Sequence, residues 1–277
     1  MEEPVQLPGS LAMMPRLGLG VYQLRGEECF TACLAGLEAG YRLVDTAQLY
    51  GNEEEVGRAV SAGRVSREDL FLTTKVGRWE GNGERMYESV LGSVMRVAGE
   101  GEGKGYVDLV LIHRPVERWR DLWSVLGRLA REGRARSIGV SNFGIEALEE
   151  MKGCEGGLPC VNQIELHPWC QQRDLVAYCQ RNGIVVQAYS PLARGRRWAD
   201  PVLREVVERV RRQVTPAQVL IRWSLQHGFI PLPKSGGASR IRENGDVFWF
   251  RLDGVDMGML DKLDLGAAGA LFPKNVS

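Results

Sequence analysis

This chain of 277 residues has few histidines and no sequence pattern typical of a metal site. Its three histidines do not sit at zinc-ligand spacing, and its six cysteines include no Cys-X-X-Cys pair. We therefore expect reduced thiols and no metal site. No run reaches the roughly 20 apolar residues that a membrane span needs, and the acidic N-terminus has no signal-peptide stretch. These absences predict a cytoplasmic protein without a membrane anchor.

An excess of charge of either sign is also absent. Lys plus Arg and Asp plus Glu both number 35, so no global field draws the chain toward nucleic acid or an anionic membrane. We expect no nucleic-acid partner, and any binding specificity has to come from local groups. The 44% of hydrophobic residues are enough to fill a large core.

Short β-branched or apolar runs alternate with longer segments of helical period along the chain. Runs this apolar are typical of strands buried on both faces of a parallel sheet. About eight strand–helix units predict an α/β fold, a single (β/α)8 barrel over 1–277 with a short tail from about 264 to 277. The expected strands are 17–21, 42–47, 71–76, 107–113, 135–142, 160–166, 184–191 and 229–235. The expected helices are 27–38, 53–62, 86–97, 120–131, 145–152, 174–181, 201–212 and 216–226.

The alternative fold is an open doubly wound sheet with a glycine-rich dinucleotide turn. Its fingerprint is missing, because the Gly18-Leu19-Gly20 turn lacks the third glycine. A second glycine-rich stretch, 101–105, resembles a phosphate loop but precedes a strand and has no Ser or Thr after its lysine. We interpret it as a solvated turn.

Polar residues stand at the carboxyl ends of the expected strands, where the active site of such a barrel lies. A lone Asp or His there is usually a turn former or a rim residue. Polar residues at seven of eight strand ends predict a shared site. They are Asp45 with Tyr50, Lys75, His113, Ser141 with Asn142, Asn162 with Gln163, Tyr189 with Ser190, and Lys234 with Ser235.

The first four of these residues suggest a reaction. A tyrosine is a poor acid near neutral pH, and the ammonium of Lys75 is expected to lower the pKa of Tyr50 by favouring the phenolate. Asp45 on the neighbouring strand is expected to pair with the buried lysine. A neutral His113 would donate a hydrogen bond that orients a substrate oxygen. With no activated nucleophile, paired carboxylates or metal ligands, the set favours carbonyl reduction over hydrolysis and requires a hydride donor.

Seven motifs together resemble the aldo-keto reductase superfamily from Leu17 to about Leu263. They are VDTAQLYGNEEEVG, LTTKV, VDLVLIHRP, RSIGVSNF, VNQIELHP, QAYSPL and PLPKSGGASRIREN. The resemblance implies a catalytic tetrad of Asp45, Tyr50, Lys75 and His113. It also implies a monomer that binds NADPH extended across the barrel mouth.

The resemblance assigns cofactor contacts to eleven further residues. Ser141, Asn142 and Gln163 would hold the nicotinamide carboxamide, and Tyr189 would stack on the ring. Ser190 and Leu192 would lie along the pyrophosphate. Lys234, Ser235 and Arg240 would bind the adenosine 2′-phosphate, with Glu243 and Asn244 near the adenine.

The substrate is less well determined than the cofactor. The family commonly has Trp after the catalytic His, where this chain has Arg114. The loops 77–85 and 193–200 and the tail after Leu263 correspond to family segments that shape the pocket. Our candidate lining residues are Tyr22, Trp79, Arg114 and Trp169.

Three alternatives to a general carbonyl reductase remain open from the sequence. One is a tailoring reductase for a specialised metabolite, with an unusual substrate or direction. Another is a non-catalytic, NADPH-binding regulatory subunit. The third is a Schiff-base barrel with Lys75 as nucleophile, which a neighbouring Asp45 disfavours by keeping the amine protonated.

Overall fold

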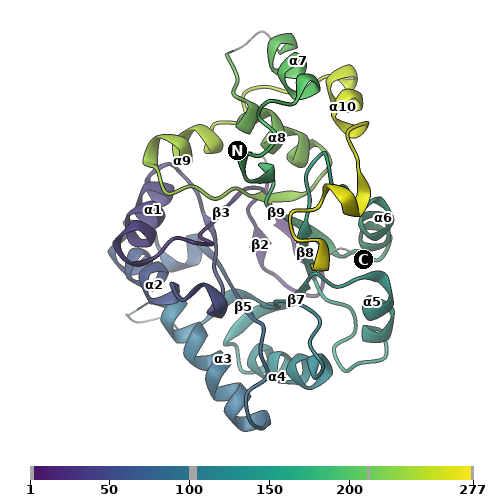
Figure 1. Ribbon diagram of the computed structural model, residues 1–277. Helices are drawn as coiled ribbons and strands as arrows, with labels where there is room; N and C mark the ends of the chain where they lie inside the picture. Colours follow the sequence, from purple (N-terminus) through teal and green to yellow (C-terminus); the bar gives the residue numbers. More distant parts are fainter. Residues whose placement is uncertain (1–2, 100–104, 211–212, 276–277) are drawn as a thin grey trace.

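A computed structural model describes residues 3–99, 105–210 and 213–275. Within them, eight parallel strands pair in chain order around a barrel (Figure 1). They are β3 (Gly18–Gly20), β4 (Leu43–Asp45), β5 (Phe71–Val76), β6 (Val107–Ile112), β7 (Ala135–Ser141), β8 (Val161–Glu165), β9 (Val185–Tyr189) and β10 (Ile230–Leu232). The expected (β/α)8 barrel is confirmed.

The barrel closes between its first and last strands. The backbone N–H of Gly20 donates to the carbonyl of Pro233 at 3.0 Å, and Gly20 bridges Lys234 in the parallel sense. A side chain at position 20 would place its Cβ 3.0 Å from the carbonyl oxygen of Leu232. Glycine therefore permits the close approach that completes the ring.

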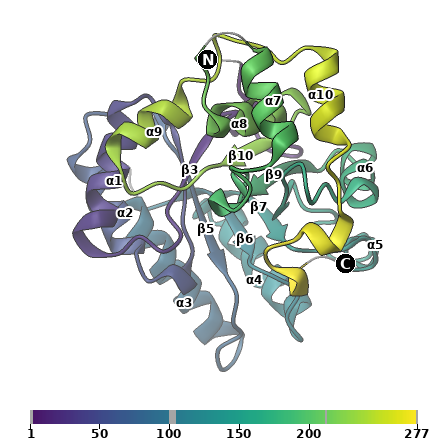
Figure 2. The same ribbon diagram turned by 45° about the horizontal axis from the view of Figure 1, so that its top comes forward.

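Helices cover the outside of the barrel (Figures 1 and 2). The one after β6 shows why: Leu122, Leu126 and Leu129 recur on one face of α4 (Trp119–Arg131) and are fully buried. The other helices are α1 (Gly26–Glu38), α2 (Glu53–Ala62), α3 (Gly83–Ala98), α5 (Ile145–Met151), α6 (Arg173–Arg181), α7 (Pro201–Arg209), α8 (Pro216–Gln226), α9 (Ala238–Gly245) and α10 (Gly254–Asp261). None of the described helices is both long and apolar enough to cross a membrane.

Two regions differ from the sequence prediction. A hairpin of β1 (Val5–Gln6) and β2 (Met13–Met14) was not expected, because two-residue strands show no alternation to detect. Helices α9 and α10, each eight residues long, were also not among the expected helices. Two predictions fall partly outside the described residues. These are residues 101–104 of the glycine-rich stretch and residues 211–212 at the end of the expected helix 201–212.

The core has an inner and an outer layer. Inside the barrel, Leu7 and Met14 from the N-terminal hairpin segment pack with strand residues such as Leu43, Leu109 and Ile230. The larger outer layer lies between the strands and the helices. The hairpin thus contributes to the inner core, and the opposite, carboxyl end of the strands is left to form the site.

The contact between α2 and α3 predicts the effect of one glycine substitution. A Cβ at Gly57 would lie 1.9 Å from the backbone oxygen of Arg96, so Gly57→Ala has to push α2 away from α3. We expect a loss of about 1–3 kcal/mol in the free energy of unfolding, measured by urea denaturation. The matched control is Gly258→Ala in α10, where nothing lies within 4 Å and the helix gains about 1 kcal/mol. Equal stabilities of the two variants would contradict the tight contact.

Candidate active site

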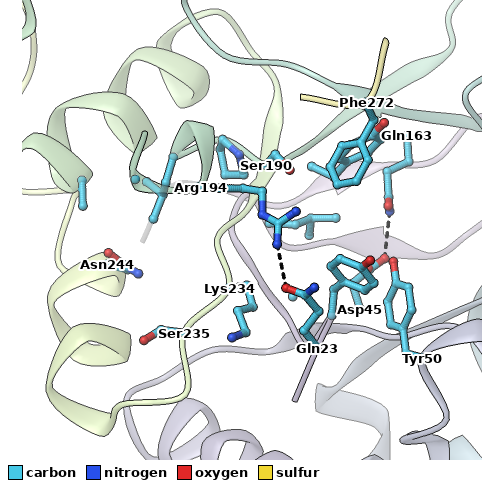
Figure 3. Close-up of a pocket in the computed structure, with 18 of the residues that line it drawn as sticks. Gln23, Asp45, Tyr50, Gln163, Ser190, Arg194, Lys234, Ser235, Asn244 and Phe272 are labelled. Atoms are coloured by element: carbon cyan, nitrogen blue, oxygen red, sulfur yellow. Dashed lines mark hydrogen bonds between the residues drawn. The ribbon is translucent and has the colours of Figure 1, made fainter. Parts of the chain in front are cut away.

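A cavity of about 920 Å³ opens at the carboxyl ends of the strands. Figure 3 shows that it extends from Tyr50 and Asp45 at one end to Ser235 and Asn244 at the other. Its size and shape suit an extended small molecule. Lining residues that the sequence predicted for the site are Tyr22, Asp45, Tyr50, His113, Arg114, Ser141, Asn142, Gln163, Tyr189, Ser190, Leu192, Lys234, Ser235, Arg240, Glu243 and Asn244.

Lys75 lies beneath this cavity at the end of β5 and is fully buried. Its Nζ donates to Asp45 Oδ1 at 2.5 Å, to the carbonyl of Thr46 at 2.9 Å and to the Tyr50 hydroxyl at 3.3 Å. These are the three bonds that one ammonium can donate. Burial opposes its charge, but Asp45 and Tyr50 more than compensate and raise the pKa of Lys75. The lysine is therefore held as a fixed cation.

The expectation about the acidity of Tyr50 is corrected. Burial of the phenol raises the pKa of Tyr50, and the charge of Asp45 adds to this. The ammonium of Lys75 acts in the predicted direction, lowering that pKa, but does not outweigh burial. Sequence alone could not show how deeply the ring is enclosed. Tyr50 consequently keeps its proton near neutral pH and has one to donate.

His113 follows β6 and faces Tyr50, with ring centroids 5.7 Å apart at an angle of 78°. Burial lowers the pKa of His113 to about 3, and the nearby charges of Lys75 and Arg114 contribute. The imidazole is therefore neutral at physiological pH. Its Nδ1 is buried without a hydrogen-bond partner among the described residues, which leaves polar capacity for a molecule in the cavity.

Asp45 is held from a second side by Gln163. Gln163 Nε2 donates to Asp45 Oδ2 at 2.8 Å and to Gln187 Oε1 at 2.9 Å. Both amide protons are used, so Gln163 offers its carbonyl oxygen to any ligand. The sequence indicated Gln163 as a site residue but not this link to Asp45, because β8 and β4 are distant along the chain.

Asn142 and Tyr189 form the next part of the wall. Asn142 has a left-handed backbone, with φ of 60°, which asparagine tolerates better than most residues. Its Nδ2 donates to the carbonyl of His113 at 3.0 Å and to Ser141 Oγ at 3.0 Å, and its Oδ1 accepts from the Tyr189 hydroxyl at 2.9 Å. These bonds fix the edge of the cavity beside His113.

The far end of the cavity carries the cations. Lys234 and Arg240 are exposed, and Arg240 Nε donates to Ser235 Oγ at 3.2 Å. That bond leaves the two amino groups of Arg240 available to a ligand. Glu243 is engaged by the Thr215 hydroxyl at 2.8 Å, and Asn244 is buried. The charge of this end is therefore mainly positive.

Two of the expected pocket residues lie elsewhere. Trp79 is not among the lining residues of the cavity; its indole lies under the guanidinium of Arg118, 4.3 Å from the ring centroid. Trp169 is 2% exposed, and its Nε1 donates to Asp200 at 3.0 Å. Tyr22 and Arg114 do line the cavity. The tryptophans follow site motifs in sequence, but neither side chain lines the cavity.

The cavity is also lined by residues that the sequence did not indicate, among them Gln23, Phe272 and Asn275. Phe272 and Asn275 come from the tail, and Arg194 donates across the mouth to Gln23 Oε1 at 2.7 Å (Figure 3). The tail and the loop containing Arg194 had been expected to border the pocket, but no motif marked Phe272 or Asn275. Contacts between positions more than 170 residues apart leave no local signal.

The described parts of the chain contain no set of side chains arranged as metal ligands. There, no group of three or more His, Cys, Asp or Glu side chains is arranged to hold a metal ion. The cysteines are free thiols. The polar groups at the Tyr50 end of the cavity are those of Asp45, Lys75, Tyr50, His113 and their amide neighbours, which suit proton delivery to an oxygen.

Comparisons with known proteins agree with this geometry. A family model described as the aldo/keto reductase family matches residues 16–265. Methylglyoxal reductase DkgA of Escherichia coli (strain K12) is 42% identical over 259 residues, covering 92% of this chain and 91% of that protein. An aldo/keto reductase crystal structure from Brucella melitensis is 39% identical with a TM-score of 0.87, covering 94% of this chain and 99% of that one. Aldose reductase from Schistosoma japonicum is 32% identical with a TM-score of 0.87, covering 96% and 93%.

The low pKa of His113 predicts that its imidazole does not titrate near neutral pH, which NMR can test directly. Its imidazole Cε1–H resonance, assigned with a His113→Asn variant, should not shift between pH 5 and 8 in NMR spectra. The unfolded residue binds a proton below about pH 6.5, whereas the folded residue does so only near pH 3. Its contribution to stability should therefore fall as the pH is lowered from about 6.5 toward 3. A titration midpoint near 6.5 in the folded protein would contradict the neutral imidazole.

Proposed function

The chain belongs to the aldo/keto reductase family, whose members are oxidoreductases acting on carbonyl compounds, and on that premise we propose an NADPH-dependent reductase. It reduces an aldehyde or ketone to an alcohol, with Tyr50 as the proton donor. The observation that carries the proposal is the buried Lys75, whose three hydrogen bonds connect Asp45, Thr46 and Tyr50.

The charges around Tyr50 support its role as the proton donor. The phenol is protonated before reaction because burial raises the pKa of Tyr50. When the proton leaves, the phenolate faces the ammonium of Lys75 at 3.3 Å, which stabilises the new charge most as it develops. The neutral His113 donates to the carbonyl oxygen and orients it toward Tyr50.

The cavity residues fit a nicotinamide dinucleotide. When bound, NADPH supplies the hydride that the carbonyl carbon accepts. Gln163 and Asn142 would offer their amide oxygens to the carboxamide, with the Ser141 hydroxyl beside them, and Tyr189 would offer a ring for stacking. Ser190 and Leu192 line the cavity along the path toward Lys234, where the pyrophosphate would lie.

The choice of NADPH over NADH rests on the cationic end of the cavity. The 2′-phosphate is a dianion, and Arg240 has two amino groups left after its bond to Ser235. Within the described residues Lys234 forms no ion pair, so its charge is available too. Such charge-assisted bonds are stronger than neutral ones. Glu243, Asn244 and Thr215 border the same end, where the adenine would bind.

A non-catalytic binding subunit is the weaker alternative. Burying the charges of Lys75 and Asp45 is costly in free energy, and cofactor binding alone does not require it. The substrate class of the curated relative, methylglyoxal, gives a first assay compound. A tailoring role on a larger carbonyl compound uses the same chemistry and differs only in the pocket.

Tyr50→Phe tests the proposed acid. We expect kcat for methylglyoxal to fall by about 100-fold or more, the usual size of a general-acid contribution. NADPH affinity, measured by protein fluorescence, should change little. Tyr87→Phe is the matched control, because Tyr87 bonds to Glu132 away from the cavity. Full turnover by Tyr50→Phe would refute the assignment.

Arg240→Gln tests the cofactor preference. Loss of one guanidinium–phosphate interaction should raise KM for NADPH about 10- to 100-fold and leave KM for NADH nearly unchanged. Arg242 is on the same helix but does not line the cavity, so Arg242→Gln controls for the loss of one positive charge outside the site. The proposal of a 2′-phosphate site at Arg240 fails if both variants behave alike or if KM rises equally for both cofactors.

A further inference from the structure

A buried carboxylate that the proposed chemistry does not use lies at the end of β8. Glu165 is 0% exposed and neighbours Tyr189 in the sheet. Its Oε1 lies 3.1 Å from His167 Nε2, and no Lys or Arg within the described residues pairs with it. A buried carboxylate is stable only when hydrogen-bond donors surround it.

The donors come from the C-terminal tail. The backbone N–H of Leu271 donates to Glu165 Oε1 at 2.5 Å, and that of Phe272 donates to Oε2 at 2.9 Å. These are consecutive peptide groups more than 100 residues away along the chain. Because each oxygen receives one N–H, the carboxylate determines both the position and the orientation of this part of the tail.

The tail places two side chains in the cavity. The ring of Phe272 meets Tyr189 edge to face, with centroids 6.0 Å apart. Asn275 Nδ2 donates to the Tyr189 hydroxyl at 3.2 Å. Figure 3 shows Phe272 over the end of the cavity that holds Tyr50 and Asp45. The tail is therefore part of the wall facing the reacting carbonyl.

Few other hydrogen bonds hold this segment, although the guanidinium of Arg194 lies 5.6 Å from the ring centroid of Phe272. Among the described residues, the hydrogen bonds joining 270–275 to the rest of the chain go to Glu165 and Tyr189. The bonds of the Ala270 and Asn275 backbone N–H groups are local, to residues three positions earlier. Chain ends are mobile unless tied down, so Glu165 is the main buried attachment of the wall.

We propose that Glu165 is a positioning residue that fixes the tail and thereby sets a preference for aromatic over small carbonyl substrates. The proposal rests on the reductase function proposed above. An aromatic aldehyde reaching Tyr50 contacts the ring of Phe272, and this contact needs a fixed ring. Methylglyoxal is too small to contact Tyr50 and the ring of Phe272 at the same time.

Glu165→Gln is the decisive variant because it keeps the size of the side chain while replacing one acceptor by an amide. We measure kcat and KM for 2-naphthaldehyde and methylglyoxal with NADPH. The naphthaldehyde kcat/KM should fall about fivefold, the size of one aromatic contact, mainly through KM. Methylglyoxal kcat/KM should fall less than twofold. Phe272→Ala should give the same pattern, and the double variant should add little to either change.

The control is Glu53→Gln, another buried carboxylate, which binds Arg96, Ser93 and Thr74 instead of the tail. It should lower stability without changing the ratio of the two kcat/KM values. Equal losses on both substrates in Glu165→Gln would mean a merely structural role and overturn the proposal. A changed ratio in Phe272→Ala but not in Glu165→Gln would also overturn it.

Hydrogen exchange separates this proposal from the proposed function. The backbone amides of Leu271 and Phe272 should exchange at least about tenfold faster in Glu165→Gln than in the wild type, and at wild-type rates in Glu53→Gln. Unchanged exchange in Glu165→Gln overturns the anchor whatever the activity. Absence of turnover by the wild type with both substrates overturns the reductase, while faster exchange would still support the anchor.

Discussion

The buried ammonium of Lys75 is the group on which the rest of the site depends. A fully buried cation is costly unless its protons are all bonded, and here Asp45, Thr46 and Tyr50 accept all three. Asp45 is in turn held by Gln163 from the other side of the barrel. One charge thus ties β4, β5 and β8 together at the mouth and leaves Tyr50 in a single position.

The same burial sets the protonation states that the proposed reaction needs. Enclosure raises the pKa of Tyr50 and lowers that of His113, so both side chains are neutral around pH 7. A neutral phenol has a proton to donate, and a neutral imidazole orients an oxygen without competing as the stronger acid. Lys75 then matters most after the proton has left, because it faces the phenolate. The environment therefore separates the roles of groups that lie within one small volume.

The remaining parts of the cavity serve different purposes at its two ends. Lys234 and Arg240 make the far end cationic, next to the closure of the barrel at β10. The near end is closed by the tail, whose Phe272 lies against Tyr189. Glu165 holds that wall by accepting the backbone N–H groups of Leu271 and Phe272. Gln163 and Glu165, two positions apart on the same face of β8, thus support the chemistry and the pocket, respectively.

The sequence by itself determined the barrel and most of the site, because strand period, turn residues and strand-end polarity are local patterns. The positions of all eight barrel strands followed from such runs, and Asp45, Tyr50, Lys75 and His113 were indicated by their place after them. Tertiary structure alone decided what depends on burial and on distant contacts. The direction of the Tyr50 pKa shift depends on how far the ring is buried, and the absence of Trp79 and Trp169 from the cavity depends on their contacts with Arg118 and Asp200. The attachment of Phe272 to Glu165 joins residues more than 100 positions apart, and no local pattern in a single sequence records such a contact.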